Sequence, residues 1–336
     1  MKPFKVCFFR LHNGVGDVVI SNFFIRELHK LAPNVELTVV ASHPTEALYK
    51  DNPRVQQIIE APAMSYPVNI VAKLEVNKDI VIGLLKTLWK VRRGHYDLLI
   101  TDFISHLTPR NMLFFALCGA KRTVLPPPAD KDTTLHRMYS YGQILQQLEI
   151  KDIDYTYEMF LSPQAQEEAA LFLKEHHIKP GFIVLNPAGR LPERILSNSQ
   201  INHILKMLHR YTPQNQVVLL DYKHQFTDFS SQATLCRFTN IPAVAALIKQ
   251  AASVITVDTS TLHIADVFQK PILALYASNS YSGDSNNRQI FSSIQKDTIY
   301  LQSHDQVSDI PLNSLEEKLQ QFVANLRNDP LSKNTL

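Results

Sequence analysis

Two short polar segments of this sequence follow apolar runs and carry residues that could do chemistry. In the first, the run 4–11 leads into Gly14-Val15-Gly16-Asp17; in the second, the run 254–257 leads into Asp258-Thr259-Ser260-Thr261. A pattern typical of a helix follows each segment. Both segments therefore place a carboxylate at a strand-to-helix junction, which is where open α/β sheets bind their ligands.

The segment around Asp258 suits a ligand that carries both hydroxyl and phosphate groups. The N–H groups of a helix N-terminus attract anions, typically phosphate. Asp258 could accept hydrogen bonds from sugar hydroxyls, while Thr259, Ser260 and Thr261 could contact phosphate oxygens. A sugar linked to a diphosphate fits this combination. The alternative is that Thr259 and Ser260 only cap a core helix.

The segment around Asp17 has two glycines in a tight turn, which lets the backbone come close to a ligand. Its pattern is GxGD rather than GxGxxG, so we expect no nicotinamide cofactor there. Asp17 is then a candidate general base. The alternative is an acid that merely stabilises the start of a helix through the helix dipole.

The apolar periodicity predicts alternating strands and helices along the whole chain. In the first half, strands are expected at 4–11, 35–41, 55–60, 96–103 and 121–125, and helices near 17–31, 44–51, 79–92, 107–118 and 138–148. In the second half, strands are expected at 182–187, 216–221, 235–238, 253–257, 271–276 and 298–301, and helices near 163–176, 197–210, 242–251, 260–268 and 312–326. This alternation predicts an α/β fold with doubly wound parallel sheets.

The domain boundary is expected near residue 160, where the pattern loosens. Ser162 is a plausible helix cap and Pro163 suits the first helical position, so a new helix is expected there. We predict Rossmann-like domains at 1–160 and 161–336, with the last helix as a candidate to pack back on the first domain.

The composition excludes several classes of protein. The 336 residues are 45% hydrophobic, enough for two cores, and 34 basic against 31 acidic residues give a net charge of only +3. This balance argues against a nucleic-acid protein. The three cysteines lie far apart, as reduced thiols of a cytosolic protein do. We expect no signal peptide, and no apolar run approaches the length of a membrane span.

Three motifs, in order along the chain, resemble those of glycosyltransferase family 9, the heptosyltransferases of lipopolysaccharide core synthesis. They are the GxGD turn at 14–17, Asn186-Pro187-Ala188-Gly189 and Asp258-Thr259-Ser260-Thr261-Leu262-His263. The resemblance implies a GT-B fold, two Rossmann-like domains facing a central cleft. It also implies an inverting transfer from a nucleotide-sugar, ADP-heptose in most relatives, to the inner core of lipopolysaccharide or lipooligosaccharide.

The resemblance further implies roles for individual residues. Asp17 would be the catalytic base of a direct displacement. Donor binding would fall to the second domain, through Asn186, Arg190, Arg194, Asp258, Thr259, Ser260, Thr261 and His263. Because guanidinium groups can bind phosphate through paired hydrogen bonds, we expect no metal and no cofactor besides the nucleotide-sugar co-substrate. The alternatives are a loop in which Glu193 pairs with an arginine, and a His263 that is simply a core residue.

Several positions depart from the usual family pattern. Arg194-Ile195 stands where a lysine before an aromatic residue is usual, Ser260 where glycine is common, Asp266 where a small residue is usual, and 277–279 where Gly-Pro-Thr is usual. These departures leave the identity of the donor sugar and nucleotide open.

The acceptor, a lipid-linked core saccharide, would need basic partners in the first domain for its phosphate and carboxylate groups. The candidates are Asn13, Gly14, Gly16, Arg110, His136 and Arg137, with Lys121, Arg122 and Lys131 as further basic residues. The alternative for each basic side chain is a solvated surface position.

The segment 79–93 allows two interpretations. Its apolar positions form a stripe, with Lys86, Lys90, Arg92, Arg93 and the only tryptophan, Trp89, around it. Such a helix could rest on an anionic membrane surface. It could equally be a domain helix that covers the sheet, with basic residues favoured at its C-terminus.

We therefore expect a cytoplasmic glycosyltransferase that serves bacterial outer-membrane biogenesis, with peripheral contact to the cytoplasmic face of the inner membrane as an option. Two rival functions remain open. One is a GT-B nucleotide-sugar epimerase or hydrolase, and the other is a degenerate relative that binds saccharide without transferring it.

Overall fold

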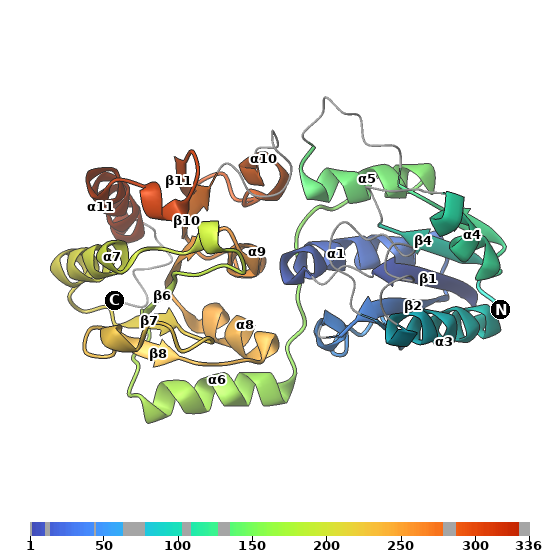
Figure 1. Cartoon of the computed structure of the whole chain (residues 1–336), viewed down its shortest axis with the longest axis horizontal. Helices are drawn as coiled ribbons and strands as arrows, with labels where there is room; N and C mark the ends of the chain where they lie inside the picture. Colours follow the sequence, from blue (N-terminus) through green and yellow to red (C-terminus); the bar gives the residue numbers. More distant parts are fainter. Residues whose placement is uncertain are drawn as a thin grey trace. The chain divides into compact units, whose positions relative to one another are not determined.

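The computed structural model describes residues 2–10, 14–43, 45–62, 78–102, 109–126, 135–277 and 287–328. The chain divides into two compact units, Met1–Phe160 and Leu161–Leu336. Each unit is an α/β layer structure around its own parallel sheet (Figure 1).

The sheet of the first unit has five described strands in the order β3-β2-β1-β4-β5, all parallel. Their bounds are β1 Phe4–Arg10, β2 Val35–Ser42, β3 Gln57–Ala61, β4 Leu98–Thr101 and β5 Arg122–Val124. The central strands are apolar on both faces because helices cover both sides of the sheet, as parallel sheets require.

The helices of the first unit pack in two groups. The bounds are α1 Val15–Leu28, α3 Lys78–Gly94, α4 Pro109–Leu117 and α5 Arg137–Gln147. On one face, Phe8 of β1 packs against Phe24 of α1 and Tyr141 of α5. On the other face, α3 and α4 bury side chains against Cys7 and Phe9 of the same strand. Alternation along β1 thus supplies both layers of core.

The sheet of the second unit has six described strands in the order β11-β10-β9-β6-β7-β8, again all parallel. Their bounds are β6 Ile183–Asn186, β7 Val217–Leu220, β8 Thr234–Cys236, β9 Ser253–Val257, β10 Ile272–Ala277 and β11 Ile299–Ser303.

The helices of the second unit are α6 Pro163–Glu175, α7 Asn198–Tyr211, α8 Ile241–Gln250, α9 Ser260–Val267, α10 Asn287–Phe291 and α11 Leu312–Asn328. Helices α7 and α11 pack against each other over one large apolar cluster, and α6, α8 and α9 pack in a row. The last helix therefore contacts α7, β10 and β11 of its own unit.

In both sheets the strand order reverses once, and each reversal defines a place where a ligand can bind. In the first unit the chain runs from β1 through β2 to β3 and then returns to β4 on the other side of β1. In the second it runs from β6 through β7 to β8 and returns to β9 on the other side of β6. At such a point the two connections leave in opposite directions, so a crevice opens at the carboxyl ends of the strands.

Two predicted elements differ from the structure. The helix expected at 44–51 is only a short 3₁₀ turn, Thr45–Leu48. Pro53 disfavours helical backbone at the residue before it, which leaves too little chain for an α-helix. The polar run 278–288 follows a strand and is typical of a loop. Residues 278–286 lie outside the described residues, and 287–288 already belong to α10, Asn287–Phe291. Among the helices described, none is long and apolar enough to span a membrane.

Candidate active site

The reversal point of the first sheet carries a group of charged residues, called here the Asp17 cluster: Arg10, Asp17, Asp102, Arg137 and Tyr141. Arg10 is the last residue of β1 and Asp102 directly follows β4, so the two meet at neighbouring strand ends. Arg10 Nε lies 3.0 Å from Asp102 Oδ2, and its Nη2 lies 3.5 Å from Asp17 Oδ2 in the first turn of α1. The guanidinium of Arg10 is fully buried beneath these two carboxylates.

Helix α5 completes the Asp17 cluster from the side. Arg137, its first residue, has Nε 3.2 Å from Asp17 Oδ1 and Nη2 3.3 Å from Asp102 Oδ2. Tyr141, one turn later, donates its hydroxyl to Asp102 Oδ2 at 2.9 Å. Asp17 and Asp102 each contact both arginines. This arrangement fixes the direction in which Asp17 points.

The charges of the Asp17 cluster balance within a buried space. Burial alone would lower the pKa of Arg10, but the negative charges of Asp102 and Asp17 outweigh it and raise that pKa above its usual value. Burial and Asp102 hold the pKa of Tyr141 well above its usual value, so this hydroxyl remains a donor. The Asp17 side chain is 13% exposed and that of Asp102 only 3%. Asp17 is thus the carboxylate that a substrate could reach.

The reversal point of the second sheet carries a second group, called here the Asp258 cluster: Asn186, Arg194, Asp258, Thr259 and Thr261. Asn186 ends β6, and Asp258 directly follows the neighbouring strand β9. The Asn186 amide donates to the hydroxyls of Thr259 at 2.9 Å and Thr261 at 2.8 Å. These bonds fasten the end of β6 to the first turn of α9.

The N-terminus of α9 has a side-chain cap, as expected from the alternative in which Thr259 caps the helix. The Thr259 hydroxyl accepts a hydrogen bond from the Thr261 N–H at 3.3 Å. The capping bond uses one of the N–H groups of the first turn, and an anion would have to use others. Ser260 is the first residue of α9 and is half-buried.

Arg194 reaches the Asp258 cluster because the loop after β6 folds back on itself. Ala188 and Ile195 form an antiparallel bridge, and the Gly189 N–H donates to the Arg194 carbonyl at 2.7 Å. A Cβ atom at Gly189 would lie 2.8 Å from Arg194 Cβ and 3.2 Å from Thr259 Cγ2. The close approach of this loop to α9 therefore requires glycine at position 189.

Arg194 pairs with Asp258 through both of its terminal nitrogens. Nη1 donates to the Asp258 backbone carbonyl at 3.1 Å, and Nη2 lies 3.1 Å from Oδ2 of the carboxylate. Burial raises the pKa of Asp258 to about 6, although the charge of Arg194 opposes the shift. Arg194 therefore lies in the Asp258 cluster with a side chain that is 15% exposed. Its contact with a donor phosphate stays a prediction, and the pairing of Glu193 with an arginine stays the alternative.

His263 and Asp266 lie deeper in the second unit. His263 is 2% exposed, with Nδ1 3.9 Å from Asp266 Oδ2 and its ring against Phe291 of α10. Asp266 accepts hydrogen bonds from Ser293 Oγ, Ile294 N and Gln295 Nε2. Burial raises the pKa of Asp266 to about 7 against these bonds. This placement is the one that the core interpretation of His263 expects, and its contact with a donor stays a prediction.

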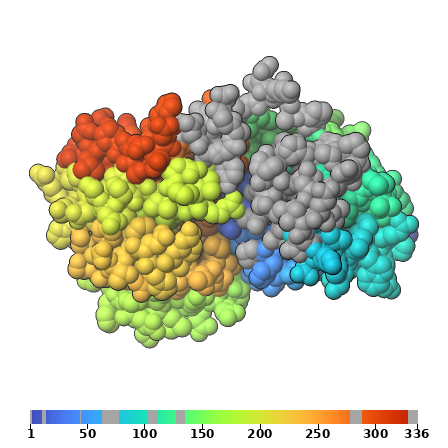
Figure 2. Space-filling model, viewed as in Figure 1, coloured from blue at the N-terminus to red at the C-terminus, as the bar shows by residue number. Residues whose placement is uncertain are grey.

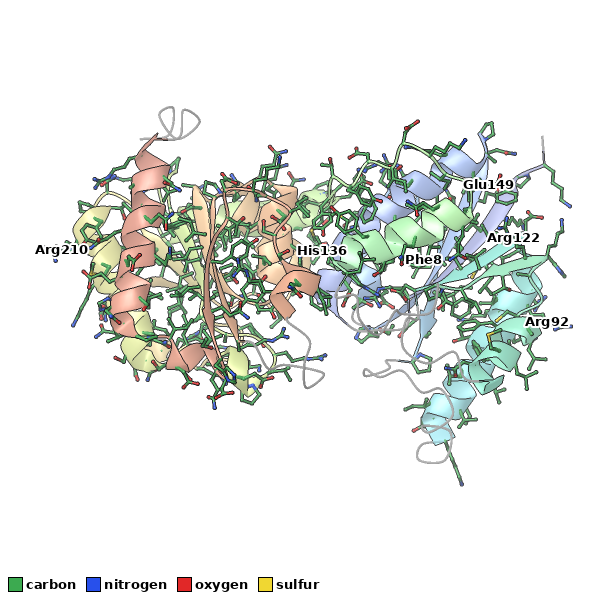
Figure 3. The ribbon with its side chains drawn as sticks, turned by 90° about the horizontal axis from the view of Figure 1, so that it is seen from above. Phe8, Arg92, Arg122, His136, Glu149 and Arg210 are labelled. Atoms are coloured by element: carbon green, nitrogen blue, oxygen red, sulfur yellow. The ribbon has the colours of Figure 1, made fainter. Side chains whose placement is uncertain are left out.

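The residues predicted for the acceptor are placed unevenly. Arg137 is part of the Asp17 cluster, and His136, just before it, accepts a hydrogen bond from the Met138 N–H and caps α5 (Figure 3). Gly14 is the N-cap of α1, and Gly16 lies in its first turn. Asn13 and the side chain of Arg110 lie outside the described residues.

Two of the other basic candidates, Lys121 and Arg122, lie at the end of the first sheet opposite the Asp17 cluster. Lys121 pairs with Asp97 at 2.6 Å, and Arg122 donates to the Gln147 carbonyl, both at the amino end of the first sheet. Figure 3 shows Arg122 and His136 at opposite ends of the first unit. Lys131 lies outside the described residues, and Arg190 is exposed on the loop that carries Arg194.

The sequence interpretation missed Arg10, Asp102 and Tyr141. A signal for Asp102 was present, because an acid closes the apolar strand 98–101 just as Asp258 closes 253–257. The range expected for that strand, 96–103, hid it by counting Asp102 as a strand residue. Arg10 and Tyr141 could be assigned to the cluster only once β1, β4 and α5 were placed together.

One group of potential metal ligands exists in the part of the chain that the structure describes. The ligand atoms of His43, Glu46 and Glu60 all lie within 4.8 Å of one another at the surface of the first unit. Glu46 already contacts Lys50 at 3.6 Å, and this group shares no residue with either cluster. The expectation that the reaction needs no metal stays a prediction.

Comparison with known proteins extends these findings. The model of glycosyltransferase family 9 (heptosyltransferase) matches residues 213–298, the part of the second unit that contains Asp258 and α9. No curated protein matches the chain in sequence.

Solved structures match nearly the whole chain. A glycosyl transferase family 9 protein from Veillonella parvula gives a TM-score of 0.76 at 16% identity, covering 97% of this chain and 98% of that one. The E. coli ADP-heptose lps heptosyltransferase II gives 0.69 at 14% identity, with 96% and 99% covered. The E. coli heptosyltransferase WaaC with ADP gives 0.66 at 10% identity, with 95% and 99% covered.

At these identities the structural matches establish the fold. The fold class is confirmed as α/β with two parallel sheets, like GT-B glycosyltransferases. The family match confirms the resemblance to glycosyltransferase family 9. Taken together, family match and fold support a glycosyltransferase of the heptosyltransferase type.

Proposed function

We propose that this protein, which resembles glycosyltransferase family 9, is an inverting glycosyltransferase that moves heptose from ADP-heptose to a hydroxyl of a lipopolysaccharide inner core. Two solved relatives are named heptosyltransferases, one of them for ADP-heptose and the other solved with ADP. The proposal places the reaction in the cytoplasm, with a lipid-linked saccharide as acceptor.

The observation that carries the proposal is the pair of clusters at the strand-order reversals. The Asp17 cluster holds one partly exposed carboxylate between Arg10 and Arg137. The Asp258 cluster joins a cation, a carboxylate and the first turn of a helix. The first set suits proton removal from a hydroxyl, and the second suits a sugar diphosphate.

In the proposed reaction the acceptor hydroxyl gives its proton to the Asp17 carboxylate as its oxygen attacks the anomeric carbon. The bond from that carbon to the diphosphate breaks at the same time, so the sugar is transferred with inverted configuration and the nucleoside diphosphate leaves. Arg194 and the first turn of α9 would stabilise the charge that develops on the leaving phosphate. Asp258 would hold Arg194 and accept hydrogen bonds from donor hydroxyls.

Asp17 also needs freedom to take a proton. Two guanidinium groups beside a carboxylate stabilise its ionised form and weaken it as a base. An anionic group of the acceptor that attracted Arg137 would remove one of these charges from Asp17. Arg137 also pairs with Asp102, so it would still have an ionic partner in the cluster if it moved away from Asp17.

The decisive test is Asp17→Asn, which keeps the size of the side chain and removes its proton affinity. Transfer to a lipopolysaccharide core acceptor should fall by roughly 10²–10⁴-fold, the usual contribution of a general base, with ADP-heptose affinity unchanged. The exposed Asp51→Asn of the same unit is the matched control and should leave the rate unchanged. Near-normal turnover by the Asp17 variant would remove this residue from the mechanism.

Incubation with ADP-heptose but without acceptor separates the rival functions. A transferase should leave the nucleotide-sugar largely intact. Epimerisation or fast hydrolysis would indicate the first rival, and donor binding with no turnover in a lipopolysaccharide extract would indicate a saccharide-binding relative.

A further inference from the structure

The outer face of α3 and α4 exposes large apolar side chains. Ile82, Leu85 and Trp89 of α3 are 49%, 58% and 58% exposed, and Met112, Leu113 and Leu117 of α4 are 44%, 60% and 45% exposed. These six are the majority of the large apolar side chains that are strongly exposed among the described residues. We call them the α3–α4 apolar surface. Exposed apolar residues that gather in one place mark an interaction site.

The α3–α4 apolar surface is not needed to hold α3 on its sheet. The helix uses a different face for that purpose, with Leu84, Thr87 and Val91 buried. Ile82, Leu85 and Trp89 follow one another at spacings of three and four, so they form a separate outward stripe. Figure 2 shows α3 in cyan at the surface of the first unit. The covering-helix interpretation of 79–93 is therefore correct for one face and leaves the other unexplained.

Helices α3 and α4 are neighbours in the first unit. They share an apolar cluster that includes Leu84 and Phe115, and the Arg92 side chain donates to the Leu117 carbonyl at 2.8 Å. Figure 3 shows Arg92, which lies in the last turn of α3. A shallow depression on α3 is lined by Ile82, Leu85, Lys86 and Trp89.

The residues around the apolar stripe are predominantly basic. Lys86, Lys90 and Arg93 are exposed beside it, and Arg93 lies over the Trp89 ring at 4.5 Å from the ring centre. The single acid of α3, Asp79, lies in the first turn of the helix, at the opposite end from Arg93. Apolar side chains flanked by cations, with a tryptophan between them, suit the boundary of an anionic lipid bilayer.

We infer that the α3–α4 apolar surface docks on an anionic phospholipid bilayer, with Trp89 and Leu85 in the acyl-headgroup boundary and Lys86, Lys90 and Arg93 against lipid phosphates. A second copy of this chain fits the surface less well. A symmetric pairing would bring the same cations face to face, and the centres of protein interfaces are poor in lysine. The inference rests on the surface alone and does not require the proposed chemistry, although it would bring the enzyme to its lipid-linked acceptor.

Trp89 makes the inference directly testable because it is the only tryptophan in the sequence. The full-length protein is mixed with vesicles of phosphatidylcholine, with and without phosphatidylglycerol. Anionic vesicles should shift Trp89 emission to the blue, and brominated acyl chains should quench it. Sedimentation with the vesicles gives the partition constant.

Variants assign the binding to this surface. Leu85→Glu should lower partition to anionic vesicles by about tenfold or more. Each of Lys86→Gln and Lys90→Gln should lower it by about fivefold, and the effect should shrink as salt rises. The matched controls lie on exposed helix positions of the second unit, Leu171→Glu on α6 and Lys206→Gln on α7, and should bind as wild type. Circular dichroism confirms that each variant is folded.

Three results would overturn the inference: unchanged Trp89 emission with anionic vesicles, equal partition of Leu85→Glu and wild type, or lipid-free self-association that Leu85→Glu abolishes. The last result would assign the surface to a second copy. Transfer to a delipidated acceptor should be the same for Leu85→Glu and wild type. If neither wild type nor Leu85→Glu transferred sugar, the proposed function would be contradicted. The vesicle result would not be affected by that outcome.

Discussion

Asp17 and Asp258 are both carboxylates beside guanidinium groups, yet their surroundings differ. Asp17 lies between two arginines and keeps part of its side chain exposed. Asp258 has Arg194 as its ionic partner in the described contacts, is almost fully buried, and has a pKa raised to about 6 by that burial. The contact with Arg194 at 3.1 Å favours the ionised form of Asp258 against this burial. The two residues suit different tasks, proton transfer for the first and placement of donor and cation for the second.

Replacing Asp258 with alanine should weaken donor binding. Hydrogen bonds to a charged group contribute about 1.5–3 kcal/mol, so the Kd for ADP-heptose should rise roughly ten- to hundredfold. Titration calorimetry measures this, with the exposed Asp228→Ala of the same unit as control. Asp258→Asn, which leaves a polar partner for Arg194, serves if the alanine variant is unstable. An unchanged Kd would remove Asp258 from the donor site.

At the scale of elements, each cluster depends on a junction between neighbouring strands and the helix that follows one of them. The Asn186 amide joins the end of β6 to the first turn of α9. The loop that carries Arg194 approaches the same turn and leaves no room for a Cβ atom at Gly189. Strand, loop and helix start therefore form one rigid unit, which is what a phosphate site needs in order to be ordered before its ligand arrives.

Asn186→Ala should destabilise this junction. The buried hydroxyl of Thr261 and the partly buried hydroxyl of Thr259 lose their amide donor, which costs about 1–3 kcal/mol. Each kcal/mol corresponds to about 2–4 °C in Tm for a unit of this size, so thermal unfolding followed by circular dichroism should show a fall of several degrees. Asn198→Ala, at an exposed position that starts α7, should change Tm little. Equal shifts in the two variants would mean that the amide bonds contribute nothing to stability.

At the scale of the whole molecule, stability should depend on pH through Asp266. Burial raises the pKa of Asp266 to about 7 in the folded protein, above the usual value near 4 for an unfolded chain. Between these values the folded state binds the proton and the unfolded state releases it. Stability from this group is therefore full below about pH 4 and is lost as pH rises toward 7.

Asp266→Asn tests this dependence because asparagine resembles the protonated acid and cannot ionise. The Tm of wild type should fall relative to that of the variant as pH rises from 4.5 to about 7, by roughly 2–4 °C for each kcal/mol of linkage. Asp228→Asn, at an exposed position, controls for general charge effects. A difference between Asp266→Asn and wild type that stayed constant over this range would show that Asp266 does not titrate there.

Much of the fold followed from local pattern. Apolar runs bounded by polar turns located the described strands to within a few residues, and Ser162-Pro163 marked the start of α6. The helix predicted at 44–51 was wrong, because a single short turn before a proline resembles the start of a helix in sequence. For the site, the junctions with Asp17 and Asp258 stood out because an acid between a strand and a helix is a local feature.

What the sequence determined by itself was the alternation of strands and helices, the two acids at strand ends and the family resemblance, since each depends on residues close together in the chain. Only the tertiary structure brought Arg10, Asp102 and Tyr141 around Asp17, because the pairing of β1 with β4 joins residues about ninety positions apart. It also decided which face of α3 is buried. Periodicity marks a stripe on a helix, and packing alone determines whether that stripe meets a core or remains at the surface.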